Sequence, residues 1–247
     1  MNTRLWRLAA TSLAAAGLMI ATNAWAAGLR ELRRTLVVVS SDIVATPPIP
    51  ERLREIGWTG GEAITDSQMM VDYYRTTRDG RIAFGKGGWG IALGGRIGPR
   101  FDRDERRARL AAADFRRLYP MLADVPIEQH WSGPIDRPAD GLPLLGRLGG
   151  RDDILYGVGW SGNGVGPSVL GGRVLGSLAL GRHDEWSAFP LVDRRPRLFP
   201  PEPVRFLGAH VVRAAVRRKE TIEAAGRHPG RLVTRIAALA PAGLEDH

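Results

Sequence analysis

The glycine-rich segment at residues 157–166 is the part of this sequence best suited to hold a ligand. It reads Gly-Val-Gly-Trp-Ser-Gly-Asn-Gly-Val-Gly, follows an apolar run at 154–158 and precedes a helix expected over 167–180. Glycine lets a backbone come close to another group, and a helix N-terminus presents free N–H groups that favour negative charge. A phosphate would suit this place, as would the N1–C2=O edge of a flavin. A tight strand-to-helix corner would explain two or three of the glycines, which favours a ligand for the rest.

Other catalytic motifs receive little support. The glycines of this segment match the pattern G-x-G-x-x-G poorly. In a dinucleotide-binding fold an acidic residue further along the chain binds the ribose, and none follows here at the expected distance. Ser161 lies in Gly-Trp-Ser-Gly, but Asn163 replaces the last glycine of a nucleophile elbow, which argues against a serine hydrolase. The five histidines are scattered and cysteine is absent, so we expect no metal site, disulfide or iron–sulfur cluster.

Composition describes a globular chain of one large or two small domains. Of 247 residues 44% are hydrophobic and 25% charged, enough for a real core. The net charge is +9, and almost all basic residues are arginine, with lysine only at Lys86 and Lys219. We attribute this bias to genomic base composition and expect no nucleic-acid partner, although a basic nucleic-acid binder is the alternative.

Strand patterns dominate the first two thirds of the chain. We expect strands at 35–46, 69–75, 81–86, 127–135 and 154–158. Asp79-Gly80 predicts a hairpin turn with both residues at positive φ. The glycine-rich run at 85–98 is expected to be a connection.

Three helices are expected. The first covers 104–118, with Asp102 or Asp104 as its N-cap and Pro120 after its end. The second, 167–180, begins at Pro167 and ends at Gly181. Gly171, Gly172 and Gly176 would let it lie close to a neighbour. The third, 204–225, follows a proline-rich linker from 190, and residues 194–247 hold eleven basic and five acidic residues. This tail is a solvated helix packed on the domain edge or an arm for a membrane surface or partner.

The N-terminus allows two interpretations. Residues 1–27 resemble a secretory signal, with Arg4 and Arg7 before an apolar stretch and Ala24-Trp25-Ala26 as a cleavage site. The alternative is an alanine-rich strand and loop of a folded domain. We expect no transmembrane anchor, because no segment is long and apolar enough.

Four stretches in order resemble the D-amino-acid-oxidase-like family of FAD-dependent oxidoreductases, which includes glycine oxidase and γ-glutamylputrescine oxidase. They cover about residues 18–181. The stretches are Ala21-Thr22-Asn23-Ala24-Trp25; Tyr73-Tyr74-Arg75 with Asp79-Gly80-Arg81-Ile82 and Phe84-Gly85; Trp131-Ser132-Gly133 with Asp140-Gly141-Leu142-Pro143 and Gly146; and Gly157 to Gly166.

The resemblance implies an α+β fold. A mostly antiparallel substrate-domain sheet (28–135) would be followed by the C-terminal strand–glycine turn–helix of an FAD-binding domain (136–181) and by a Pro-rich linker with a basic helical tail (190–247). Residues 1–27 would then be the last strand and loop of a truncated FAD domain, which favours a cytoplasmic protein over one exported through residues 1–26.

The resemblance also implies FAD as cofactor and hydride transfer from the carbon beside an amine to flavin N5. The flavin-contacting residues would be Trp160, Ser161, Gly162, Asn163, Gly164 and Val165, with N–H groups of the last four facing the N1–O2 edge. Trp160 would pack on the ring or cap the cavity. Tyr74, Arg75, Lys86 and Trp131 are the substrate-pocket candidates. Each aromatic is alternatively a core side chain, and Lys86 is either a fixed cation that activates oxygen or, as we favour, a surface lysine at a strand end.

Two departures from the family pattern change the expectation. The dinucleotide fingerprint is missing from these residues, so we expect a truncated form that binds FAD poorly by itself. The position four residues after Trp131, where the family's amino-acid oxidases usually place a carboxylate-binding arginine, is Ile135, followed by Asp136 and Arg137. This favours an amine or modified amino acid as substrate, with Arg75 or Arg81 as a remaining carboxylate clamp. A cofactor-free exported or remnant binding protein is the alternative.

Overall fold

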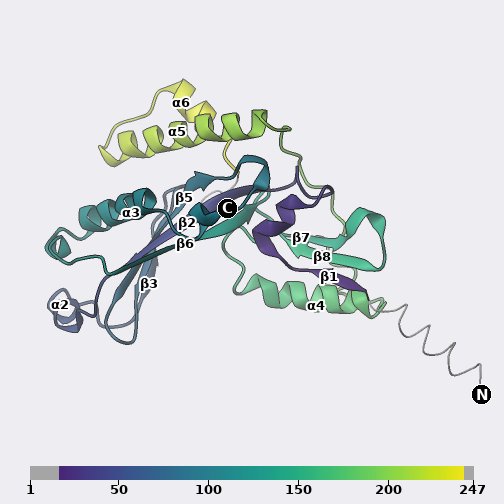
Figure 1. Ribbon diagram of the computed structural model, residues 1–247, viewed down its shortest axis with the longest axis horizontal. Helices are drawn as coiled ribbons and strands as arrows, with labels where there is room; N and C mark the ends of the chain where they lie inside the picture. Colours follow the sequence, from purple (N-terminus) through teal and green to yellow (C-terminus); the bar gives the residue numbers. More distant parts are fainter. Residues whose placement is uncertain (1–16, 242–247) are drawn as a thin grey trace, which may run out of the picture.

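The computed structural model describes residues 17–241, which form two β-sheets with helices around them (Figure 1). The five-stranded sheet has the order β3-β4-β5-β2-β6, and every pairing in it is antiparallel. The three-stranded sheet has the order β1-β8-β7. The strands are β1 (Leu18–Ile20), β2 (Val37–Ala45), β3 (Ala63–Thr65), β4 (Asp72–Thr76), β5 (Ile82–Ile91), β6 (Gln129–Arg137), β7 (Leu144–Arg147) and β8 (Ile154–Val158).

Four helices of two or more turns are placed around these sheets. α3 (Glu105–Leu118) packs on the five-stranded sheet through Ala108, Ala111 and Phe115, and α4 (Pro167–Ala179) packs on β7 and β8. α5 (Val204–Ala224) and α6 (Arg231–Ala237) lie on the opposite side of the molecule from α4 (Figure 1). Shorter helices are η1 (Asn23–Gly28), α2 (Pro50–Glu55), η2 (Leu93–Gly95), η3 (Pro99–Phe101), η4 (Pro120–Leu122) and η5 (Leu148–Gly150).

These observations confirm the α+β fold class and most of the expected elements. Asp104 is the N-cap of α3, its carboxylate accepting from the Arg107 N–H at 3.0 Å. Gly181 follows α4 at φ +61°. β4 begins at Asp72 rather than at Met69, and β6 is displaced by two residues from the expected span. α2, β3, β7 and α6 were not expected.

The expectation of a connection at 85–98 is wrong for residues 85–91, because these residues belong to strand β5, which continues to Ile91. The long strand β2 offers this segment a partner, and the pairing continues with an irregularity between Val39 and Ser41. The Asp79-Gly80 turn also differs from expectation. Gly80 has φ +80° but Asp79 is not left-handed, because the loop is a four-residue turn closed by Gly80 N–H to the Thr77 carbonyl at 3.0 Å.

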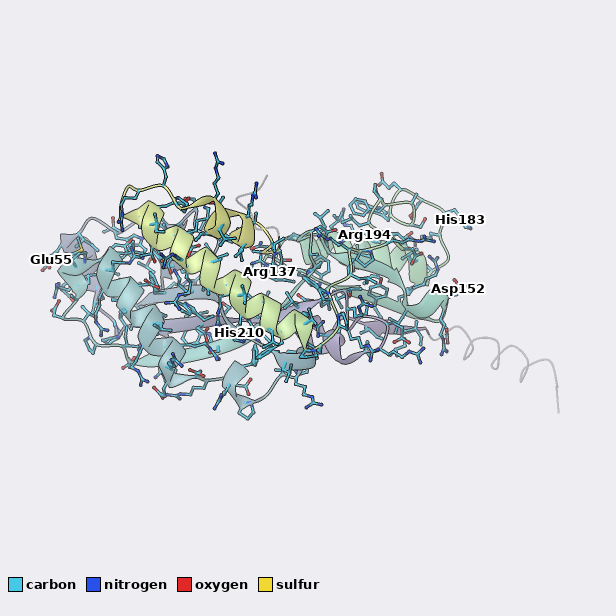
Figure 2. The ribbon with its side chains drawn as sticks, turned by 90° about the horizontal axis from the view of Figure 1, so that it is seen from above. Glu55, Arg137, Asp152, His183, Arg194 and His210 are labelled. Atoms are coloured by element: carbon cyan, nitrogen blue, oxygen red, sulfur yellow. The ribbon has the colours of Figure 1, made fainter. Side chains whose placement is uncertain are left out.

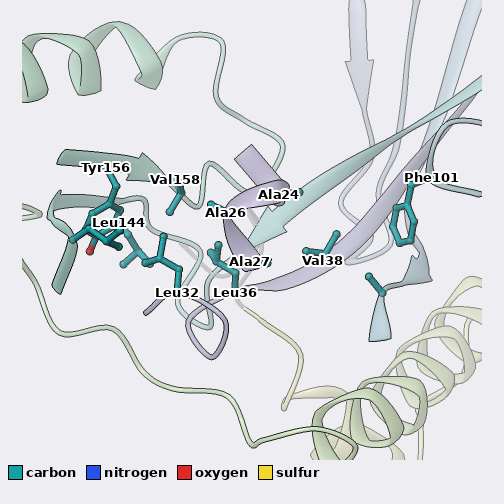
Figure 3. Close-up of a cluster of buried hydrophobic side chains, with 12 residues drawn as sticks. Ala24, Ala26, Ala27, Leu32, Leu36, Val38, Phe101, Leu144, Tyr156 and Val158 are labelled. Atoms are coloured by element: carbon teal, nitrogen blue, oxygen red, sulfur yellow. The ribbon is translucent and has the colours of Figure 1, made fainter. Parts of the chain in front are cut away.

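The alanine-rich N-terminal segment is part of a buried core. β1 pairs parallel with β8, and the side chains of Ala24, Ala26 and Ala27 are at most 1% exposed among residues of β2, β7 and β8 (Figure 3). This arrangement supports the strand-and-loop interpretation for residues 18–27. Arg4, Arg7 and most of the apolar stretch of the signal-like segment lie outside the described residues.

The basic tail is packed against the body. In the linker, the Phe199 N–H donates to the Arg34 carbonyl at 2.8 Å and Asp193 N–H donates to the Leu145 carbonyl at 2.8 Å. Ala215 and Val216 of α5 are buried in one cluster with Met70. The Glu220 carboxylate accepts a hydrogen bond from the Met70 N–H at 2.9 Å. Within residues 17–241, no helix is long and apolar enough to cross a membrane.

Candidate functional site

Asp136, at the end of β6, holds the start of the glycine turn. Its fully buried carboxylate accepts from the N–H groups of Gly159 at 2.5 Å and Trp160 at 3.1 Å. Its main-chain carbonyl accepts from Ser161 N–H at 3.1 Å. Burial raises the pKa of this carboxyl above its ordinary value. The sequence pattern indicates Asp136 only as the residue after Ile135, and it does not predict that Asp136 holds the glycine turn.

The turn leaves several backbone donors available. Ser161 and Gly162 have φ +55° and +87°, the left-handed region that an L side chain such as that of Ser161 enters only with strain. Within the described part of the chain, the N–H groups of Gly162, Gly164 and Val165 donate to no protein acceptor. They lie just before α4, whose dipole favours negative charge at this end. The expected fourth donor is wrong, because Asn163 N–H is used by the Trp160 carbonyl at 2.9 Å.

Trp160 packs between this turn and α4. A Cβ placed on Gly164 would be 3.0 Å from the Trp160 Cβ, and one on Gly171 would clash with the end of the indole. The ring therefore fills a slot between the turn and α4, and Gly164 of the turn and Gly171 of α4 make room for it. Gly172 and Gly176 were expected to approach a neighbour as well, but within residues 17–241 nothing lies within 4 Å of a Cβ at either.

Ser161 is used to connect two loops. Its hydroxyl donates to the Gly141 carbonyl at 3.1 Å. The neighbouring Asp140 carboxylate is held by the Arg194 guanidinium at 2.6 and 3.0 Å. The serine therefore fixes the return loop at 140–143 beside the turn.

One face of the five-stranded sheet runs toward the turn, and we call it the turn face. A Cβ on Gly162 would lie 3.1 Å from the Ile135 Cδ1, so the side chain of Ile135 points at the turn. Directly paired residues share a face in an antiparallel sheet. The register pairs Ile135 with Val39, Gly133 with Ser41, and Trp131 with Ile43. β5 and β4 continue this face with Gly85, Gly87, Tyr73 and Arg75.

Tyr73 crosses the middle of the turn face. A Cβ on Gly85 would clash with its ring, so the glycine lets the ring lie flat on the strand. The Tyr73 hydroxyl is hydrogen-bonded to the Ser41 hydroxyl, and burial raises the pKa of Tyr73. From the sequence we selected Tyr74 and missed Tyr73, although alternation along a strand places Tyr73, not Tyr74, on the side of Arg75.

Tyr74 belongs to the opposite face, covered by α3, which we call the α3 face. Its ring stacks on Phe84 with centroids 5.2 Å apart and meets Trp58 edge-on at 5.9 Å. The structure therefore supports the core interpretation of this side chain. It does not bring Tyr74 to the glycine turn.

Lys86 is also on the α3 face, and the expectation of a surface lysine is wrong. The residue is 4% exposed, and its Nζ lies 3.0 Å from Asp72 Oδ1 and 3.5 Å from Asp114 Oδ2. β5 continues beyond Lys86, which buries a position expected at a strand end. Burial raises the pKa of Asp72 to about 6, against the lowering effect of Lys86. The sheet separates Lys86 from the turn face.

Arg75 and Trp131, two of the expected substrate-pocket residues, lie on the turn face. Trp131 is 42% exposed, and Arg75 lines a hollow of about 340 Å³ with Tyr73 and Ile43. Arg81 is engaged elsewhere, by Asp79 at 2.8 Å and by Glu128. Among the two alternative carboxylate clamps, only Arg75 remains available to a ligand.

Together these residues form a shallow floor with hydrogen-bond donors at one end. Glycines keep the floor low, and the three free N–H groups fit a flat group that carries or develops negative charge at one edge. An isoalloxazine ring has this shape and chemistry. The 247 residues contain no dinucleotide fingerprint for the ADP half of FAD, so the fit concerns the flavin ring alone.

Comparison with protein families agrees with this chemistry. The family model described as FAD dependent oxidoreductase matches residues 2–178. A probable oxidoreductase OrdL of Haemophilus influenzae is 27% identical over 176 residues, which is 69% of this chain and 37% of that protein. The gamma-glutamylputrescine oxidoreductase of Escherichia coli is 28% identical over 166 residues, 67% of this chain and 36% of that protein. The chain thus spans little more than a third of these relatives.

Solved structures show the same fold over a similar span. Glycine oxidase from Geobacillus kaustophilus has a TM-score of 0.52 at 21% identity, covering 72% of this chain and 45% of that chain. Fructosyl peptide oxidase from E. terrenum has a TM-score of 0.59 at 13% identity, covering 76% of this chain and 46% of that chain.

Proposed function

Because the chain belongs to the family of FAD-dependent oxidoreductases, we propose that it provides the flavin-contacting turn and substrate-facing sheet of an amine-oxidising flavoenzyme. Residues 28–135 act as the substrate domain and 136–181 as the FAD-contacting segment. Residues 190–247 add a tail beyond the family-matched region.

The observation that carries this proposal is the set of free N–H groups at Gly162, Gly164 and Val165, next to the glycine floor of the turn face. A bound flavin supplies the acceptor for the hydride that leaves the carbon beside the amine. The turn would donate hydrogen bonds to the N1–O2 edge, and the α4 dipole would stabilise negative charge there. Asp136 would keep the turn in this shape.

The turn face also supports an amine or modified amino acid as substrate. Ile135 offers no charge where the family's amino-acid oxidases carry an arginine, and it points at the turn. Trp131 and Tyr73 would wall the substrate, while Arg75 stands at the far side for a distant acidic group. The name of the relative in Escherichia coli, a gamma-glutamylputrescine oxidoreductase, supports this assignment.

Isolation of the native protein from its source cells tests the function. We expect flavin absorption bands, and faster oxidation of polyamine-type amines than of plain D-amino acids. Faster oxidation of D-amino acids would overturn the substrate assignment, and a colourless native protein would overturn the flavin assignment. The 247-residue chain by itself should bind FAD weakly, because these residues lack a grip on its ADP half.

A pair of glycine variants tests the turn directly. Gly162→Ala forces a side chain into the left-handed region and toward Ile135, so we expect at least a tenfold loss of flavin affinity in the native holoprotein. Gly172→Ala, within α4 and with nothing within 4 Å, is the matched control and should leave the affinity unchanged. Equal losses in both variants would argue against ligand contact at the turn.

The proposed location is the cytoplasm. Cleavage after Ala26 would remove β1 from its pairing with β8 and two fully buried alanines from the core. N-terminal sequencing of the native protein tests this, and a mature chain that begins at Ala27 would show export instead.

A further inference from the structure

A second cavity lies between the C-terminal tail and the end of the turn face at Val37 and Val39, and none of residues 157–166 lines it. It measures about 480 Å³ and is bounded by the start of β2, the end of β5, the end of β6 and the α5–α6 pair. This volume is within the range of about 300–1,000 Å³ typical of small-molecule sites. Seen from above, α5 crosses the sheet, with His210 on it and Arg137 near the end of α6 (Figure 2).

Most of the cavity wall is aliphatic. Val37, Val39 and Ile91 contribute from the sheet, and Val204, Val212 and Val216 from α5. The tail wall lies beyond the residues matched by the family model. The cavity thus has a sheet wall within the family-matched region and a tail wall beyond it.

Arg213 places a positive charge at this aliphatic wall. Its guanidinium donates to the Trp89 carbonyl and contacts His210 Nδ1 at 2.9 Å, and both of these partners are uncharged acceptors. Among residues 17–241, no carboxylate forms an ion pair with it. Burial and the nearby guanidinium groups of Arg217 and Arg106 lower the pKa of Arg213, as expected where positive charge lacks compensation.

Arg205, on the same helix and the same cavity, shows the contrast. Its guanidinium pairs with the Glu202 carboxylate at 2.7 Å and donates to the Leu36 carbonyl at 3.0 Å. Of these two arginines of α5, Arg205 is therefore neutralised within the tail and Arg213 is left with neutral partners. An anion brought by a ligand would compensate Arg213 in the same way that Glu202 compensates Arg205.

We propose that this cavity binds a monocarboxylate with an aliphatic chain, with the carboxylate on Arg213 and the chain along the valines of β2 and α5. The guanidinium fork matches a carboxylate, and the aliphatic wall removes the chain from water.

Titration calorimetry of the 247-residue chain with decanoate, below its micelle-forming concentration, tests the proposal. We expect saturable binding of one decanoate per chain, at least tenfold weaker binding of 1-decanol, and at least a tenfold loss with Arg213→Gln. Arg218→Gln, an exposed position on the same helix, is the matched control and should bind as the wild type does.

A cavity-filling variant keeps the test independent of Arg213. Gly208 lines the cavity with nothing within 4 Å of a Cβ, so Gly208→Leu adds bulk there while favouring the helix. We expect it to abolish decanoate binding without lowering the melting temperature. Absence of saturable binding, equal affinity for 1-decanol, or unchanged binding in Gly208→Leu would overturn the proposal. No flavin is needed, so the outcome does not depend on the proposed oxidase function.

Discussion

The two faces of the five-stranded sheet are made by alternate residues of the same strands, yet they are built for different purposes. The α3 face holds large aromatic side chains and buried charges that have partners, such as Phe84 and the Lys86–Asp72 pair. The turn face holds glycines, a tyrosine hydroxyl and a half-exposed tryptophan. The first face specifies and stabilises the fold. The second leaves space and hydrogen-bonding groups where we propose that the ligand binds, so variants on the two faces should separate stability from binding.

The largest expected difference between the faces comes from aromatic truncation. Phe84→Ala removes a ring that is 1% exposed and contacts Phe115 and Tyr74, so we expect a loss of about 4 kcal/mol in the free energy of unfolding. Trp131→Ala, on the turn face, should cost less than about 1 kcal/mol because its side chain is already half in water. Urea denaturation of both variants measures this. Equal losses would contradict the division between the faces.

The buried ion pair gives the next effect. Lys86→Met removes the nearest cation from the buried Asp72 carboxyl and leaves it only the half-exposed Arg117 guanidinium at 3.5 Å, so we expect a loss of about 3 kcal/mol in unfolding free energy. The double variant Lys86→Met with Asp72→Leu removes both charges and should recover most of that loss. If the double variant were no more stable than the single one, the pair would not be the cause.

The pH dependence of stability should carry the signature of Asp72. Its pKa is about 6 in the folded protein, against an ordinary value of 3.8 for a carboxyl in water, so the folded state binds this proton more tightly than the unfolded state does. The contribution of this carboxyl to the free energy of unfolding is therefore full below about pH 3.8 and is lost as the pH rises through 6. Relative to Asp72→Asn, which cannot titrate there, the wild type should therefore gain on the order of 2 kcal/mol as the pH falls from about 7 to about 4. A pH-independent difference would show that this carboxyl does not titrate in the window.

The smallest effect is on the turn face itself. Gly85→Ala displaces the Tyr73 ring and its hydrogen bond to Ser41, which should cost about 1–2 kcal/mol. Gly133→Ala is a matched control on the same face, with nothing within 4 Å of the added methyl, and should be nearly neutral. In a Tyr73→Ala background the Gly85→Ala penalty should largely disappear. A penalty that persists there would point to the strand backbone instead of the ring.

Local sequence signals predicted the elements whose ends are set by capping or terminating residues within the same segment. α3 begins at its aspartate cap and α4 runs from Pro167 to a left-handed glycine, because these residues act through bonds within the helix end. The turn at 157–166 was recognisable for the same reason. The backbone N–H groups of Gly162, Gly164 and Val165 are available, as expected. The N–H group of Asn163 differs, because it donates to a carbonyl within the turn.

Tertiary contacts decided what the sequence did not predict. Glycines such as Gly87 and Gly88 are poor strand formers, but β2 lies alongside this segment and pairs with Gly87 and Ile91 on either side of the irregularity. Tyr73 and Tyr74 differ only in which face each occupies, and that depends on the burial of Phe84 beneath α3. The packing of the tail over the sheet depends on Met70 and Trp89, which no pattern within the tail reveals.

The parallel pairing of β1 with β8 has a consequence for how the chain acquires its structure. Leu18 pairs with Ile154, so the small sheet joins segments from opposite ends of the family-matched region. Such long-range closure is slow, whereas the hairpin of β4 and β5 and helix α3 rest on nearer contacts. On the ribosome the larger sheet can therefore condense first, while the apolar β1 waits for β8 to emerge. We expect this waiting period to be the stage of synthesis at which the protein depends most on chaperones.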